Sequence, residues 1–266
     1  MIRACSILTI LLWSFTVLQA QRSELHLRRS TVDAAGTLTV SLTRFTKGTA
    51  EQTPIDTAGC VVSVDGTVVP IENIDCQKSG STDDLSSVLT IDVSGSMAKG
   101  GPNIVLARSA AQAWVRALSP GSECAITAFD HSASLIHDFS SDTTSLLRSI
   151  DRLSPRGGTD YDAGMLTDEL GGIPMAATGR NRRVLVFLTD GIGRATTARM
   201  MAEAQAAGVT VYCVTLGMPM PEGLRSLCEA IGGLWFDNVT TIDQARMAYQ
   251  RIHAAATAPQ ACELRV

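Results

Sequence analysis

The sequence predicts an α/β fold in which a doubly wound, mostly parallel sheet is flanked by helices, with a small all-β module before it. Between residues 85 and 257, apolar strand-like segments alternate with helical ones, which is typical of a parallel sheet covered on both faces. Residues 24–80 instead show apolar positions with a period of two, as in antiparallel strands. Polar clusters directly follow two of the apolar strands, where sheets of this class bind ligands.

The first 20 residues predict a secretory signal peptide (residues 1–20). Arg3 supplies a positive start, residues 7–18 are almost wholly apolar, and Ala20 is a small residue before Gln21. The apolar run is short for a membrane span, and the rest of the chain has no apolar stretch of about 18 residues. We therefore expect a secreted or periplasmic protein with no membrane span beyond the signal peptide. An uncleaved N-terminal anchor remains the alternative.

Residues 21–84 are expected to form a small β-rich module and a linker. Asp65-Gly66 lies between two valine-rich segments, which predicts a hairpin over residues 60–69. The module is small, so we expect it to pack against the domain that follows. Residues 258–266 read as a strand-like tail. This tail either joins the N-terminal module or begins a further domain, and the sequence leaves both open.

Residues 85–257 carry the alternating elements of the α/β domain. Residues 183–189 form an apolar run that polar residues do not interrupt, which is typical of a strand buried on both faces. Gly208 directly follows a predicted helix, the position that glycine favours most. The predicted strands are 85–91, 124–129, 133–139, 183–189, 209–216 and 234–236. The predicted helices are 103–118, 143–153, 161–170, 197–207, 221–231 and 241–255.

Charge and aromatic content argue against a nucleic-acid partner. The chain has 22 Lys and Arg against 26 Asp and Glu, a net charge of −4, and only 5% aromatic residues. A nucleic-acid binder would need a basic surface or a set of stacking aromatic side chains. We therefore do not expect a nucleic acid as a partner.

Six cysteines lie beyond the predicted signal peptide, and none shows the spacing of a zinc site. Cys124 and Cys213 lie in apolar strand segments and are expected to be buried free thiols. The pattern favours two disulfides, because one pair of cysteines flanks the predicted hairpin and the other flanks the last helix. These pairs are Cys60 with Cys76, and Cys228 with Cys262.

Three polar segments are expected at one edge of the sheet. The first holds Asp92, Ser94 and Ser96 in the order Asp-x-Ser-x-Ser, the second holds Thr159, and the third holds Asp190. Two carboxylates and three hydroxyls form an oxygen-only donor set, which suits a hard cation such as Mg²⁺ or Mn²⁺. These five residues are the predicted metal ligands.

Together the segments resemble the metal-ion-dependent adhesion site (MIDAS) of the von Willebrand factor type A (VWA) domain family. The resemblance covers about residues 85–257 and implies a Rossmann-like, doubly wound VWA fold. It implies that Ser94 and Ser96 bind the metal directly, and that Thr159 binds it directly or through water. It also implies that Asp92 and Asp190 often act through water, and that a partner's Glu or Asp completes the coordination. A shift of the last helix coupled to the metal loop is a further implication.

The sequence therefore predicts an exported, metal-dependent adhesion domain that binds a protein ligand through an acidic side chain. The alternative is a structural or assembly subunit that docks through its β-module, with a metal that mainly stabilises the fold. An enzyme is not expected, since Ser94 lacks the GxSxG setting and no general base is visible beside the site. Asp160 is expected to cap the next helix, and Asp130 to cap or to touch the rim.

Overall fold

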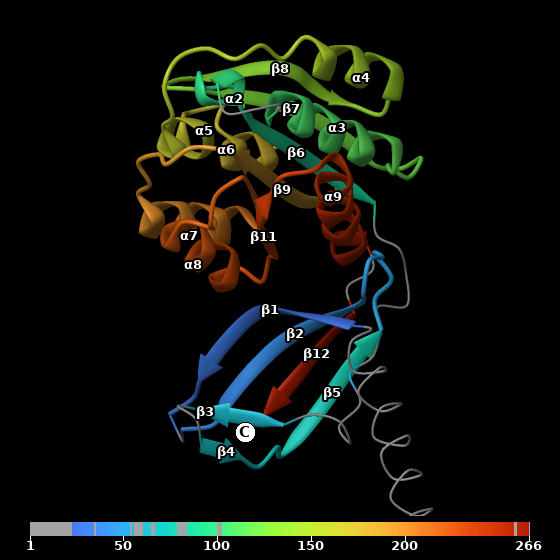
Figure 1. Ribbon diagram of the computed structural model, residues 1–266, viewed down its shortest axis with the longest axis vertical. Coiled ribbons are helices and arrows are strands. Elements are labelled where there is room, and N and C mark those ends of the chain that lie inside the picture. The colour runs from blue at the N-terminus through green and yellow to red at the C-terminus, as the bar shows by residue number, and fades with distance from the viewer. Residues whose placement is uncertain are drawn as a thin grey trace, which may run out of the picture.

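The computed structural model describes residues 23–34, 36–53, 55, 61–64, 67–78, 84–99, 103–257 and 260–265. It has two regions stacked along the long axis of the molecule, an α/β region and a strand-rich region (Figure 1). The predicted signal peptide and Cys60 lie outside the described residues. No helix in the described ranges is long and apolar enough to cross a membrane.

The α/β region is built on a six-stranded sheet, and only its last pair of strands is antiparallel. All side chains of its central strand, β6, are buried, because helices cover both faces. The mostly parallel sheet predicted from the sequence is confirmed. In spatial order the strands are β11 (Trp235–Val239), β10 (Thr210–Leu216), β9 (Arg182–Thr189), β6 (Leu85–Asp92), β7 (Glu123–Phe129) and β8 (Ala133–Ser140).

Helices form a layer on each face of this sheet (Figure 1). On β9, Val184 and Val186 point into the core beneath one layer, whereas Leu185 and Phe187 point into the other. This is the doubly wound arrangement that was predicted. The first layer consists of α3 (Asn103–Arg116), α4 (Thr143–Asp151) and α9 (Ile242–Thr257). The second consists of α5 (Tyr161–Leu166), α6 (Gly172–Ala177), α7 (Thr197–Ala207) and α8 (Glu222–Ala230).

The predicted helix over 161–170 is wrong in its second half, because α5 ends at Leu166 and a separate helix, α6, follows. No element was predicted over residues 172–177, the range of α6. In the structure α6 lies so close to the sheet that a Cβ on Gly172 would come within 2.4 Å of Thr90 Oγ1. Glycine is therefore used here for close packing of the helix. The short α2 (Ser96–Lys99) was also not predicted.

The strand-rich region contains antiparallel sheets, as predicted. Its larger sheet has four strands, and its smaller sheet is a two-stranded hairpin that confirms the pairing expected on either side of residues 65–66. The four strands in spatial order are β1 (Ser23–Val32), β2 (Leu38–Thr46), β12 (Gln260–Arg265) and β5 (Asn73–Lys78). The hairpin pairs β3 (Val62–Val64) with β4 (Thr67–Val69). The C-terminal strand β12 thus lies between two N-terminal strands, β2 and β5.

The disulfide pairing predicted from the sequence is wrong. Cys76 of β5 is bonded to Cys262 of β12, its direct neighbour in the sheet, with a sequence separation of 186 residues. Local flanking patterns could not reveal this pair, because it exists only once β12 returns to the first region. Cys228 is a free buried thiol in the core between α8 and the sheet. Cys124 and Cys213 are buried free thiols, as expected.

Two buried arginines, one on α9 and one on β1, join the two regions. Arg251 is only 5% exposed and donates from Nη1 to Glu24 Oε2 at 2.5 Å and from Nε to the Thr49 carbonyl at 2.8 Å. Its guanidinium also lies 5.2 Å from the centre of the Phe45 ring, a cation–π contact. Arg28 of β1 donates twice to the Gly232 carbonyl, from Nη2 at 2.9 Å and from Nε at 3.1 Å. The strand-rich region therefore packs on the α/β region through buried cations.

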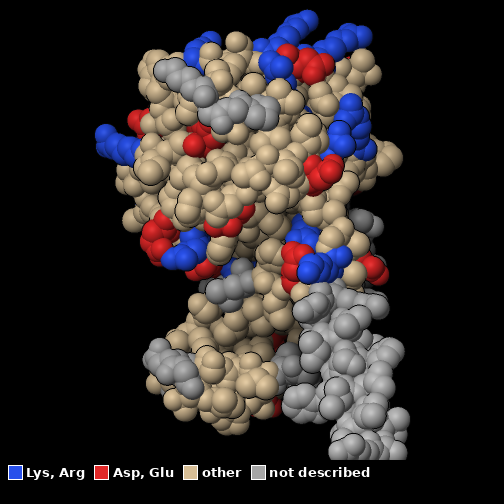
Figure 2. Space-filling view, in the orientation of Figure 1, with Lys and Arg blue, Asp and Glu red and all other residues tan. Residues whose placement is uncertain are grey.

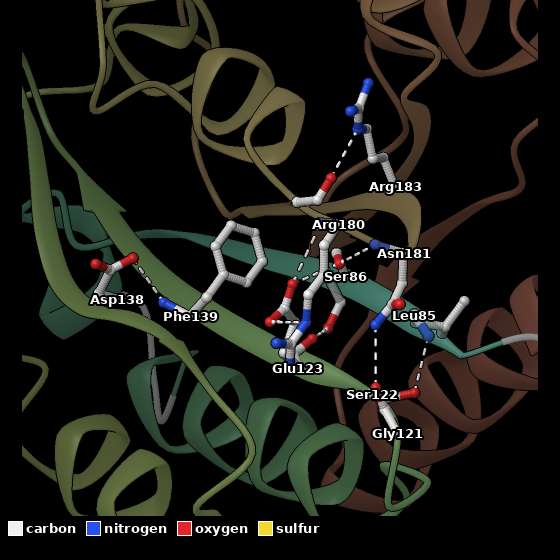
Figure 3. A network of polar contacts seen from close by, with 12 residues as sticks. Leu85, Ser86, Gly121, Ser122, Glu123, Asp138, Phe139, Arg180, Asn181 and Arg183 are labelled. Atoms are coloured by element: carbon white, nitrogen blue, oxygen red, sulfur yellow. Dashed lines mark hydrogen bonds and ion pairs between the residues drawn. The ribbon is translucent and has the colours of Figure 1, made fainter.

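A polar network closes the amino-terminal edge of the six-stranded sheet (Figure 3). Glu123 is 7% exposed, and its carboxylate accepts from Ser86 Oγ at 2.7 Å and pairs with Arg180 Nε at 3.0 Å. Asn181 N in turn donates to Ser86 Oγ at 2.9 Å. The buried carboxylate is fully engaged within the protein, which indicates a structural role. The candidate site lies at the opposite edge, where the parallel strands end.

Candidate metal centre

Asp92 is the last residue of β6, and its side chain is completely buried. One carboxylate oxygen accepts from the Ser94 backbone N–H at 2.7 Å, and the other accepts from Thr189 Oγ1 at 2.6 Å. Burial raises the pKa of Asp92, hydrogen bonds from Ser94 and Thr189 oppose that rise, and the nearby Asp190 carboxylate adds to it. An ionised Asp92 would be stabilised by a cation at this edge.

The hydroxyls of Ser94 and Ser96 and the carboxylate of Asp190 form a continuous row of oxygens. Ser94 Oγ and Ser96 Oγ are 2.9 Å apart, and Ser96 Oγ donates to Asp190 Oδ1 at 2.6 Å. Ser94 is buried, whereas Ser96 and Asp190 are partly exposed. The row therefore begins in the protein interior and opens toward solvent.

Thr159 lies at the same place, on the loop before α5. A Cβ on Gly191 would lie 2.9 Å from Thr159 Oγ1 and 3.5 Å from Ser96 Oγ, so both hydroxyls border one glycine. The Gly95 N–H donates to the Gly157 carbonyl at 3.0 Å and ties the first loop to the second. All five predicted ligands are thus gathered at one edge of the sheet.

This donor set fits a hard divalent cation. Its side-chain donors are oxygens, two of them on carboxylates, which is the ligand chemistry that Mg²⁺ and Mn²⁺ prefer. Among the described residues there is no cluster of three or more His, Cys, Asp or Glu side chains that could hold a metal. Metal binding here would therefore depend on the serine and threonine hydroxyls as much as on the two aspartates.

Three further side chains hold the site, and none of them was predicted to do so. Asn103, the first residue of α3, donates from Nδ2 to Asp190 Oδ2 at 2.8 Å. Thr189 binds Asp92, and the Tyr161 hydroxyl donates to the Gly191 carbonyl. The position of Thr189 directly before Asp190 was a usable signal. Nothing in the local sequence of Asn103 or Tyr161 points to these contacts, which depend on the packing of helices against the sheet.

The neighbouring acidic residues have structural partners. Asp160 caps α5 by accepting from the Asp162 N–H at 2.9 Å, as predicted. Asp130 is 2% exposed, accepts from the Ser132 N–H at 2.8 Å, and pairs with Arg156 Nε at 3.3 Å. Its carboxylate also borders Gly157, since a Cβ there would lie 2.7 Å from Asp130 Oδ2. Asp130 therefore both stabilises its own turn and supports the loop that carries Thr159.

Comparisons with known proteins agree with this geometry. Residues 87–192 match the family model of the von Willebrand factor type A domain, a range that contains all five predicted ligands. A search of curated proteins found no matching relative.

Solved structures share the fold at low sequence identity. A von Willebrand factor type A protein from Catenulispora acidiphila is 16% identical with a TM-score of 0.57, over 88% of this chain and 49% of that one. Proximal thread matrix protein 1 from the mussel byssus, described with a zinc-occupied MIDAS motif, is 16% identical with a TM-score of 0.56, over 73% and 49%. The VWA domain of a type V pili tip protein from Porphyromonas gingivalis is 15% identical with a TM-score of 0.51, over 66% and 96%.

The chain spans about half the length of the first two of these structures. Identities of this size establish the fold alone. The match over residues 87–192 and the sheet flanked by two helical layers together show that the α/β region of this chain has the fold of a von Willebrand factor type A domain.

Proposed function

We propose that the site is a MIDAS that holds Mg²⁺ or Mn²⁺ and captures an acidic side chain of a protein partner. Ser94, Ser96 and Thr159 would supply hydroxyl ligands, and Asp92 and Asp190 would balance the charge of the ion. The observation that carries the proposal is the row of oxygens from Ser94 through Ser96 to Asp190, with successive distances of 2.9 and 2.6 Å.

The way this row is exposed favours capture of a partner over a purely structural ion. Ser96, Thr159 and Asp190 are partly exposed, so a ligand can approach the outer side of an ion held there. A site with hydroxyl ligands and few direct carboxylates leaves a divalent ion with unbalanced positive charge, which attracts an incoming anion. The zinc-occupied MIDAS described for the mussel protein supports the assignment of a divalent ion to this fold.

Metal binding is tested by thermal unfolding of the full chain in EDTA and across a Mg²⁺ titration. At one hundred times its dissociation constant, a bound ion should stabilise the fold by about 2.7 kcal/mol. For a domain of this size we expect a rise in Tm of about 5–10 °C. Asp190→Asn should abolish the rise, whereas Asp151→Asn, whose carboxylate binds Gln112 on the surface, should keep it.

Capture of an acidic group is tested with two immobilised peptides that differ only by Glu or Gln at one position. Binding of the glutamate peptide in Mg²⁺, lost in EDTA and in Asp190→Asn, is the expected result. Equal binding of the two peptides, or binding that EDTA leaves unchanged, would contradict the proposal.

A second candidate is a structural or assembly subunit that docks through the strand-rich region. Large apolar side chains are exposed there, including Val61 at 78%, Val68 at 68% and Val32 at 67%. The face of this region seen in Figure 2 also carries few charged side chains. A partner that stays bound in EDTA but is lost when Val61 and Val68 are both replaced by serine would favour this role.

We also propose that residues 1–20 direct export and that the site is not catalytic. The disulfide between Cys76 and Cys262 supports export, because such bonds persist in oxidising compartments. Mass spectrometry of the exported protein should find Gln21 as its first residue. Uncleaved chains held at the membrane would instead indicate the anchor.

A further inference from the structure

Ile192 is a large apolar side chain that the metal-site loop holds in solvent. It is 83% exposed, more than any other large apolar side chain among the described residues. It is separated from Asp190 only by Gly191, and the Gly191 Cβ position lies 2.9 Å from Thr159 Oγ1 and 3.5 Å from Ser96 Oγ. Consecutive Cα atoms are about 3.8 Å apart, so Ile192 stands at the rim of the site.

The loop that carries Ile192 is anchored on both sides. The Tyr161 hydroxyl donates to the Gly191 carbonyl, and the Tyr161 N–H donates to the Arg194 carbonyl at 3.0 Å. Gly193 packs so closely on the Tyr161 ring that a Cβ would lie 2.5 Å from it. These contacts fix the backbone before and after Ile192, yet the isoleucine side chain itself stays out of the core. Fold stability thus gives no reason for an apolar residue here.

Two arginines of the described residues near this rim are already paired within the protein. Arg156 pairs with Asp130 at 3.3 Å and donates to Ser134 Oγ at 2.9 Å, and Arg194 pairs with Asp162 at 3.5 Å. Neither arginine needs an acidic partner from outside to balance its charge. Ile192 therefore offers a partner an apolar contact at the rim, which an apolar group of the partner can cover.

We propose that Ile192 selects protein segments in which the metal-binding Asp or Glu has a large apolar side chain one or two residues away. This inference rests on the proposed metal-dependent capture and adds a partner requirement to it. Within an extended segment, residues one and two positions from the carboxylate lie about 3.3 and 6.8 Å along the chain, and the second of them lies on the same face as the carboxylate. These lengths are comparable with the roughly 3.8 Å between the Cα atoms of Gly191 and Ile192. Burying the isoleucine against it would stabilise the complex.

The test uses an immobilised set of eight-residue peptides, each with one central Glu and with Leu, Phe, Ser or Lys placed one or two residues away. A second set carries Gln in place of Glu. Binding of the full chain is compared with that of Ile192→Ser and of Val68→Ser, an exposed valine in the strand-rich region that serves as a matched control. Each is measured in Mg²⁺ and in EDTA.

The parent and Val68→Ser should bind Leu and Phe peptides at least tenfold more tightly than Ser peptides, in Mg²⁺ and only with Glu. Ile192→Ser should lose this preference while its rise in Tm with Mg²⁺ stays unchanged. Glu-dependent binding without an apolar preference, or the same preference in Ile192→Ser, would overturn the proposed role of Ile192. Either result would leave the proposed metal-dependent capture standing. Binding that depends on neither Glu nor Mg²⁺ would overturn the proposed function and this inference with it.

Discussion

Asn103 Nδ2 donates to Asp190 Oδ2 at 2.8 Å, a contact between residues 87 positions apart in the chain. The other oxygen of Asp190 accepts from Ser96, so the carboxylate is held from two sides. Asn103 begins α3, and α3 packs against α9 in the core. The position of the helix therefore controls the orientation of Asp190, a predicted metal ligand. Residues that hydrogen-bond to metal ligands commonly orient them in this way.

Replacing Asn103 with alanine should weaken Mg²⁺ binding by about tenfold to a hundredfold, because Asp190 loses one of the two donors that orient it. The affinity is measured by isothermal titration calorimetry with MgCl₂. Gln112→Ala is the control, since Gln112 lies on the same helix and binds Asp151 instead. Equal affinities in the parent and in Asn103→Ala would show that Ser96 alone positions the carboxylate.

A pair of glycine substitutions separates the two loops of the site. A Cβ on Gly193 would lie 2.5 Å from the Tyr161 ring, whereas one on Gly158 would meet no atom within 4 Å. Gly193→Ala should therefore displace the loop that carries Asp190 and lower the Mg²⁺-dependent rise in Tm. Gly158→Ala should leave that rise unchanged. The same thermal titration is applied to both variants. An unchanged rise in Tm in Gly193→Ala would mean that the loop can shift without weakening Mg²⁺ binding.

Breaking the disulfide should strongly destabilise the strand-rich region. Cys76 and Cys262 close a loop with a sequence separation of 186, for which chain entropy predicts a stabilisation of up to about 5 kcal/mol. Replacing both cysteines with serine should lower the denaturant midpoint measured by circular dichroism. A reducing agent should lower the parent's midpoint similarly and leave the double variant unaffected. An unchanged midpoint in the reduced parent would contradict the expected stabilisation.

The contact between the two regions should weaken in acid. His26 of β1 lies between the rings of Phe45 and Phe236, with centroid distances of 5.5 and 5.0 Å. Burial lowers its pKa below the ordinary 6.5, Arg251 lowers it further, and Glu24 partly opposes this. The folded state thus binds the proton less readily than the unfolded chain. The contribution of neutral His26 to stability is fully present above pH 6.5 and is lost as the pH falls below it.

Urea unfolding between pH 8 and pH 5 measures this loss. His26→Leu should reduce the dependence of stability on pH by at most about 1.4 kcal/mol per pH unit. Burial also lowers the pKa of His253, so some dependence should remain in the variant. An unchanged profile in His26→Leu would show that His26 does not titrate in this range.

The sequence predicts most of the sheet because strands such as β9 and β10 are largely apolar segments that are buried on both faces. The positions of the candidate ligands were also predictable, since Asp92, Ser94, Ser96 and Asp190 lie in polar segments at the ends of strands. Thr159 lies instead in a glycine-containing loop directly before α5. Asn103 and Tyr161 were not, because their contacts arise from the docking of α3 and α5 onto the sheet. A local pattern carries no information about which distant residue a helix terminus will face.

The same limit explains the errors at α6 and at the disulfide. Gly172 begins α6, where close approach to Thr90 leaves no room for a larger residue, and no local pattern reveals that contact. Cys262 reads as a neighbour of Cys228 along the chain, but β12 pairs with β5 across the whole inserted domain. Both features depend on contacts between segments far apart in sequence, where turn and helix preferences give no guidance.

The bond between Cys76 and Cys262 also determines how the molecule would carry mechanical load. A pull applied between β1 and the end of β12 reaches the bond before it reaches β6, so the tension bypasses the α/β region. A pull applied through a ligand at Asp190 instead passes through the domain and enters two adjacent strands that are covalently joined. The α/β region can then unfold while the bond between Cys76 and Cys262 keeps both of its ends joined to the strand-rich region. The disulfide thus limits how far the chain can extend under load.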